Sequence, residues 1–120
     1  MAVNYIYALK ATYEPLRVIA FGAIPAAYSP NGKFGTPLTQ IGRILTFKNG
    51  TNSDMYISFD GVNDHEWLPS ETFDKTDHTS NKASRPGGFL GIPANTQIWI
   101  RYGTGAPTAG QATLSVVYGS

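Results

Sequence analysis

Two Asp-His pairs, Asp64-His65 and Asp77-His78, are the residues of this chain that most suggest metal chemistry. Together with Asp60 they would supply the imidazole and carboxylate groups that bind divalent metals. Their spacing matches no metal motif, because the sequence contains neither HxH nor HExxH. Both pairs also lie in polar segments rich in turn-forming residues. We therefore predict that they are turn residues and that the protein uses no metal and no other cofactor.

The residues of an enzyme active site do not occur in a recognisable arrangement. The chain has no cysteine and no GxSxG motif, which excludes a thiol nucleophile and the serine elbow of hydrolases. Asp60, Asp64 and Glu66 are close enough in sequence to form a carboxylate pair, but they flank a Gly turn, where carboxylates commonly bond the backbone. No catalytic residues are predicted, and we expect a protein without enzymatic activity.

Aromatic residues are the remaining candidates for a functional role, with seven tyrosines and two tryptophans in 120 residues. Trp67 and Trp99 would suit a stacking platform for sugar, as in a carbohydrate-binding β-sandwich module. They would equally suit the core or a protein interface, where aromatic residues are common. We predict that Trp67 is a buried anchor, and sugar binding by exposed aromatics remains the alternative.

The charge content limits the partners. A net charge of +1 provides no basic surface for nucleic acid. Only 14% of the residues are charged, against about 25–35% on a well-solvated designed surface, which suggests that another protein covers part of the molecule. No apolar run approaches the roughly 20 residues that span a membrane, and the first residues lack a signal-peptide pattern. We expect no nucleic-acid or membrane partner and folding in a cytoplasm.

Alternation of apolar and polar residues, the period of a half-buried strand, recurs along the chain. It predicts strands at 3–13, 45–47, 55–59, 97–102 and 112–118, with shorter strands at 67–68 and 71–73. Residues 17–21 are apolar on both faces and predict a central strand, and the turn formers at 49–54 predict a hairpin loop. The predicted core anchors are Phe47, Ile57, Phe59, Trp67, Ile98, Ile100, Leu114 and Val116.

Two long segments lack this period. Residues 22–40 contain three prolines and form a Pro/Gly-rich loop, a type of segment that is often functional. Tyr28 and Phe34 within it are predicted either to fold back onto the domain or to dock on a neighbouring subunit. Residues 74–88 are the most polar stretch and predict a surface loop.

Together these patterns predict an all-β fold, in one domain that covers residues 1–120. Seven to eight mainly antiparallel strands with long loops and no convincing helix favour a β-sandwich or jelly roll. A small closed barrel is the alternative. Residues 1–14 would form an N-terminal strand or arm.

Two stretches, TFKNGTNSDMYISFDGVNDHEWLPS at 46–70 and GGFLGIPANTQIWIRYGTGAPTAGQATLSVVYGS at 87–120, resemble small virion structural proteins of tailed bacteriophages. The shared features are an Asn-rich turn, the SFDG strand end, a Pro-Ala-Asn turn before an aromatic strand, and a GTGAP loop before a final VYG strand. The resemblance implies a β-sandwich subunit present in many copies and without enzymatic activity. Its place would be that of a head decoration (cement) protein or a head-to-tail adaptor or collar protein.

We therefore expect a structural subunit of a virion, assembled in the host cytoplasm. It would bind other virion proteins, such as capsid, portal or tail components, and form a homo-oligomer or a multi-copy lattice. The N-terminal strand has few charges that would block edge-to-edge pairing, and the Pro-rich loop carries aromatic residues of the kind enriched at interfaces. The predicted assembly contacts are Tyr5, Tyr7, Tyr13, Tyr28 and Phe34.

Overall fold

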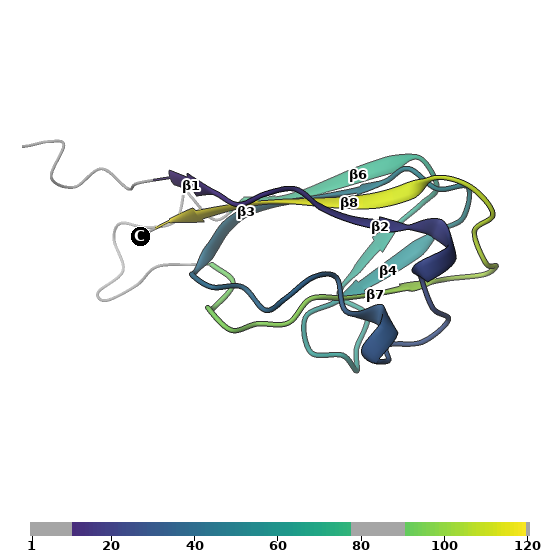
Figure 1. Cartoon of the computed structure of the whole chain (residues 1–120), viewed down its shortest axis with the longest axis horizontal. Coiled ribbons are helices and arrows are strands. Elements are labelled where there is room, and N and C mark those ends of the chain that lie inside the picture. Colours follow the sequence, from purple (N-terminus) through teal and green to yellow (C-terminus); the bar gives the residue numbers. More distant parts are fainter. Residues whose placement is uncertain (1–10, 78–90, 120) are drawn as a thin grey trace, which may run out of the picture.

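The computed structural model describes residues 11–77 and 91–119, and it confirms the prediction of an all-β sandwich. Two antiparallel sheets face each other as an upper and a lower layer (Figure 1). Two short 3-10 helices lie at Phe21–Ala23 and Pro30–Gly32. The strands are β1 (Ala11–Tyr13), β2 (Arg17–Ala20), β3 (Gly42–Asn49), β4 (Met55–Ser58), β5 (Glu66–Leu68), β6 (Thr72–Asp77), β7 (Trp99–Tyr102) and β8 (Gln111–Gly119).

The larger sheet is organised around its two long strands. β8 pairs with β3 on one side and with β1 and β2 on the other, and β6 completes the sheet beyond β3. The smaller sheet has the order β5-β4-β7. Alternation along these strands sends about every second side chain into the space between the sheets. The buried residues that they contribute include Leu45, Phe47, Met55, Ile57, Ile100, Leu114 and Val116.

Residues 49–54 do not form the predicted hairpin loop. They carry the chain from β3 in the larger sheet to β4 in the smaller one, and these two strands do not pair with each other. The Asn49 side chain is fully buried and organises this crossing. It donates to the Leu68 and Ser53 carbonyls and accepts from the Thr51 backbone amide. Turn-forming residues thus carry the chain from one sheet to the other here, whereas in a hairpin they would return it to the same sheet.

The prediction of a central strand at residues 17–21 is also wrong. Among the described strands, β2 pairs only with β8, and together with β1 it lies at an edge of the larger sheet. Its two faces are unequal, because Ile19 packs against the core whereas Val18 is 51% exposed. The apolar residues on both faces of β2 therefore do not indicate burial on both sides, because the outer face of this edge strand is exposed.

The Pro/Gly-rich segment 22–40 folds back and closes the sandwich beside β7. The Phe34 amide donates to the Ile98 carbonyl at 2.8 Å, and the Leu38 amide donates to the Thr96 carbonyl at 3.0 Å. Phe34, predicted as an assembly contact, is 1% exposed and belongs to the core. Its ring cannot contact a neighbouring subunit, because the backbone bond between Phe34 and Ile98 directs the ring between the two sheets.

The prediction that Trp67 is a buried anchor is also wrong, since Trp67 is 58% exposed. Glu66 and Leu68 take the inward positions of β5, opposite Ile57 and Met55, so the two-residue period turns Trp67 outward. Phe59 is half-buried and contacts the Phe47 ring edge-on. The other predicted anchors are buried: Phe47, Ile57, Ile98, Ile100, Leu114 and Val116.

The polar stretch predicted as a loop from residue 74 begins as a strand. β6 continues to Asp77 and pairs with β3 along its whole length. The β6 sequence, TFDKTD, is polar or charged except at Phe73. Charged residues of this kind are common in strands at the edge of a sheet. The rest of the stretch, with His78, and most of the N-terminal segment, with Tyr5 and Tyr7, lie outside the described residues.

Candidate functional site

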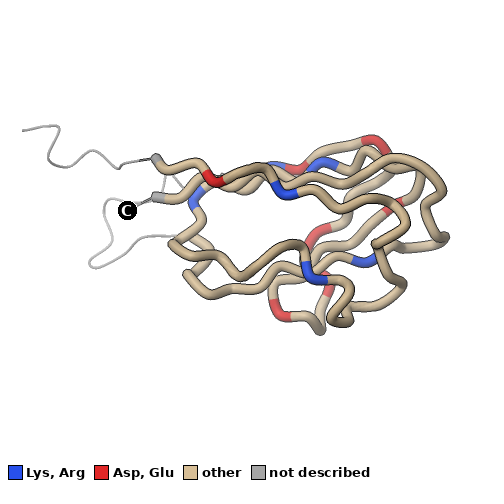
Figure 2. Tube along the Cα trace, viewed as in Figure 1, with Lys and Arg blue, Asp and Glu red and all other residues tan. Residues whose placement is uncertain are grey.

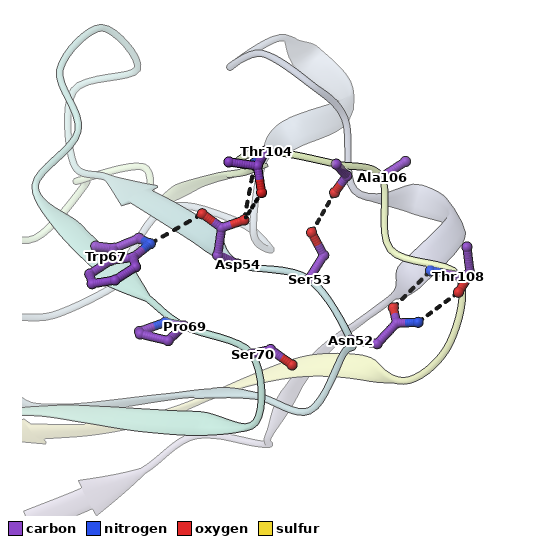
Figure 3. Close-up of a pocket in the computed structure, with 10 residues that line it drawn as sticks. Asn52, Ser53, Asp54, Trp67, Pro69, Ser70, Thr104, Ala106 and Thr108 are labelled. Carbon is purple, nitrogen blue, oxygen red and sulfur yellow. Dashed lines mark hydrogen bonds between the residues drawn. The ribbon is translucent and has the colours of Figure 1, made fainter.

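A surface pocket of about 670 Å³ lies where three segments meet at one end of the sandwich (Figure 3). These segments are the 49–54 crossing, the end of β5 and the loop at residues 103–110. The polar and aromatic residues that line the pocket are Asn52, Ser53, Asp54, Trp67, Ser70, Thr104 and Thr108.

Asp54 fixes the position of the Trp67 indole. The indole Nε1 donates to Asp54 Oδ2 at 3.2 Å, while Asp54 Oδ1 accepts from the Thr104 amide at 3.0 Å and from its Oγ1 at 2.9 Å (Figure 3). The Thr104 backbone amide, foremost among these donors, lowers the pKa of Asp54 below its ordinary value. A Cβ on Gly103 would collide with the carboxylate. The carboxylate is therefore ionised at neutral pH and orients the aromatic ring.

The walls of the pocket are held together by hydrogen bonds between its loops. Asn52 Nδ2 donates to Thr108 Oγ1 at 2.6 Å, and the Thr108 amide donates back to Asn52 Oδ1 at 2.9 Å. Ser53 Oγ donates to the Gly105 carbonyl. These bonds join segments more than 50 residues apart in sequence, so the pocket is formed in the folded chain before any ligand arrives.

A second polar cluster fastens the Pro/Gly-rich loop to the smaller sheet. Arg101 donates to both oxygens of Asp64, at 3.1 and 2.7 Å, and Tyr28 donates its hydroxyl to the same carboxylate. Burial, and after it the hydrogen bond to Asp64, raises the pKa of Tyr28 well above its ordinary range. The Arg101 guanidinium also lies 4.4 Å from the centre of the Tyr56 ring. Tyr28, a predicted assembly contact, is thus half-buried and engaged within its own chain.

Asp60 and His65 act in a turn, as their sequence context predicts. Asp60 Oδ1 accepts from the amides of Val62 and Asn63, both at 2.8 Å. The bond from the Asn63 amide, followed by that from Val62, lowers the pKa of Asp60. His65 Nδ1 accepts from the Phe59 amide at 3.0 Å. Within residues 11–77 and 91–119, no group of three or more His, Asp or Glu side chains is placed to hold a metal ion. The predicted independence from metal stays a prediction, because His78 lies outside these residues.

Two carboxyl groups meet on the inner side of the sandwich where β5 approaches β6. Glu66 lies opposite Ile57, and Asp74 lies opposite Phe47, so both point between the sheets. Burial and then the hydrogen bond to Asp74 raise the pKa of Glu66 from 4.5 to about 7. A proton shared by two close carboxyls explains the direction of this shift.

We predict that the Glu66 carboxyl makes stability depend on pH. Between pH 4.5 and about 7 the folded chain keeps a proton that the unfolded chain has lost, so stability falls as pH rises through this range. The Glu66→Gln variant should melt at nearly the same temperature across the range and above wild type at about pH 8. Thermal melts at several pH values test this, with the exposed Glu71→Gln variant as control. A wild-type slope in Glu66→Gln would show that another group is responsible.

The outer face of the larger sheet carries most of the exposed apolar residues. Val18, Thr113, Lys48 and Phe73 are register partners in a row across four strands, which spans about 14 Å. Thr46, Lys48, Thr113 and Ser115 form the floor of a shallow hollow of about 430 Å³ that Leu16 borders. We call this surface the outer apolar face, after the exposed residues Tyr13 (73%), Leu16 (58%), Val18 (51%) and Phe73 (69%).

Three of the predicted assembly contacts lie in the described residues, and of these Tyr13 is on this face whereas Tyr28 and Phe34 are not. Val18 and Phe73 were not predicted as surface residues, although the alternation from Thr72 to Lys75 places Phe73 on the face opposite to the inward Asp74. The contact of Asp54 with Trp67 and Thr104 was not predicted either, because no local pattern relates residues 13 and 50 positions apart.

Comparison of the chain with protein-family models, with curated proteins and with solved structures found no match. In the part of the chain that the structure describes, no helix is both long and apolar enough to cross a membrane. Function must therefore be inferred from the surfaces themselves.

Proposed function

We propose that this protein is a non-enzymatic structural subunit of a bacteriophage virion and that it binds other virion proteins through the outer apolar face. The observation that carries the proposal is the exposure of Tyr13, Leu16, Val18 and Phe73 on one sheet surface. Large apolar groups gathered on one face are typical of protein-binding sites. The resemblance of residues 46–70 and 87–120 to small virion proteins of tailed phages supports a phage particle as the assembly.

The distribution of charge fits this role. Lys, Arg, Asp and Glu residues are spread over both layers of the sandwich (Figure 2). On the outer apolar face, Lys48 lies between Thr113 and Phe73, and Lys75 lies opposite Thr46. A surface of this kind loses little hydration when it is covered, because few charges must be desolvated. In a decoration lattice or an adaptor ring, the same contact would repeat by symmetry.

A double substitution on this face tests the proposal. We expect Val18→Asp/Phe73→Asp to fold with nearly the wild-type melting temperature, because both side chains are exposed. It should be lost from purified particles, because two carboxylates would be desolvated in the contact. The measurement is the copy number of the protein relative to the major capsid protein in purified virions.

The matched control is Val62→Asp, which adds a carboxylate at a 78% exposed valine in the turn between β4 and β5. This variant should join particles normally. If the double variant is incorporated at the wild-type copy number, the outer apolar face is not the contact. Absence of the wild-type protein from virions would refute the assembly role itself.

A further inference from the structure

We propose that Trp67 and the polar pocket beside it bind one pyranose ring of a neutral saccharide. This site lies at the edge of the smaller sheet and is independent of the outer apolar face of the larger one. The proposal depends on the exposed aromatic ring, on the way the ring is held and on the chemistry of the groups around it.

Trp67, Tyr56 and Arg101 are register partners in a row across β5, β4 and β7. Of the two aromatic rings in this row, that of Trp67 is the one free to receive a ligand. The Arg101 guanidinium lies over the Tyr56 ring and also near Tyr28, so these two rings already have cationic partners within the chain. Trp67, in contrast, remains 58% exposed. A single free ring suits a single sugar unit.

The orientation of the indole favours stacking. Its one polar group, Nε1, is directed at Asp54, and Asp54 is fixed in turn by Thr104. The hydrogen bond occupies an edge of the ring and leaves a face of the π system for contact. The C–H groups on one side of a pyranose carry partial positive charge and are attracted to that negative face. Because the ring is already fixed, little side-chain entropy is lost when a ligand binds.

The pocket wall supplies partners for sugar hydroxyls. Thr104 Oγ1 donates its proton to Asp54, and Ser70 Oγ donates its proton to the Thr51 carbonyl at 2.8 Å. The lone pairs of both hydroxyl oxygens remain available as acceptors. Among the described residues that line the pocket, Asp54 is the only charged one, and none is Lys or Arg. A phosphate or carboxylate ligand would meet this negative charge without a counter-ion, so a neutral polyol fits best.

The test uses the indole N–H signals of the two tryptophans in ¹H–¹⁵N spectra of the full chain. Neutral sugars serve as probes: glucose, galactose, mannose, N-acetylglucosamine and β-linked oligomers of each, titrated into the millimolar range. We expect at least one probe to shift the Trp67 signal saturably and to leave the Trp99 signal in place. Trp67→Ala should abolish binding, and Asp54→Asn should weaken it several-fold by loosening the ring.

The control is Phe73→Ala, which removes another exposed aromatic ring, from the other sheet, and should leave saccharide binding unchanged. The proposal is overturned if no probe shifts the Trp67 signal, or if both tryptophan signals shift together without saturation. It is also overturned if Trp67→Ala removes the protein from virions while no sugar binds, since the surface is then a protein contact. A loss of saccharide binding without loss of particle incorporation leaves the proposed assembly role intact.

Discussion

Replacing Phe34 with Ala is expected to lower the free energy of unfolding by about 3–5 kcal/mol, the usual range for a buried phenylalanine. Phe34 is 1% exposed, and its backbone is held on both sides. Its amide donates to the Ile98 carbonyl, and its carbonyl accepts from Arg17 Nη1 at 2.9 Å. The loop therefore cannot collapse easily into the cavity that Ala would leave. Urea denaturation with fitted slopes measures the effect.

The same experiment separates two roles for the Pro/Gly-rich loop. Phe73→Ala, at a 69% exposed position, should change stability by less than about 0.5 kcal/mol and serves as the control. If Phe34→Ala were as mild as this control, Phe34 would not belong to the core. A fully stable Phe34→Ala variant that fails to join particles would restore it as an assembly contact.

Replacing Asn49 with Ala is expected to cost at least about 2 kcal/mol, because buried backbone groups left without partners cost about 1–3 kcal/mol each. The carboxamide donates to the Leu68 carbonyl at 2.9 Å and accepts from the Thr51 amide at 3.0 Å, both in buried positions. No apolar side chain can replace these bonds. Thermal and urea unfolding of the variant measure the loss.

A nearby asparagine provides the matched control for this prediction. Asn52 lies in the same crossing but is exposed, and it bonds the exposed Thr108. Water can replace these partners, so Asn52→Ala should cost less than about 1 kcal/mol. Equal losses in the two variants would mean that burial of Asn49 is not what stabilises the crossing between the sheets.

The sequence by itself determined several of the described strands and the faces that they bury. Phe47 lies between Thr46 and Lys48, Leu114 lies between Thr113 and Ser115, and both anchors are buried as predicted. This information is local, because a strand turns successive side chains to opposite sides whatever its partners are. The turn at Asp60 was predictable for the same reason, as was the absence of long helices from the residues that the structure describes.

Pairing between strands was decided only by the tertiary structure. The turn formers of residues 49–54 are equally suited to a hairpin and to a crossing between sheets, since both need the same local backbone conformations. The choice depends on β6 and β8, which pair with β3 from 23 or more positions away along the chain. Such long-range contacts leave no trace in a local pattern.

Exposure of individual aromatic residues was decided in the same way. Trp67 is outward because Leu68 holds the inward position opposite Met55, and Phe34 is inward because its backbone pairs beside Ile98. Hydrophobicity favours burial of both rings equally, but the core has room only for the side chains that the register directs into it. The register of β5 thereby leaves an aromatic ring at the surface, where Asp54 and Thr104 hold it in place.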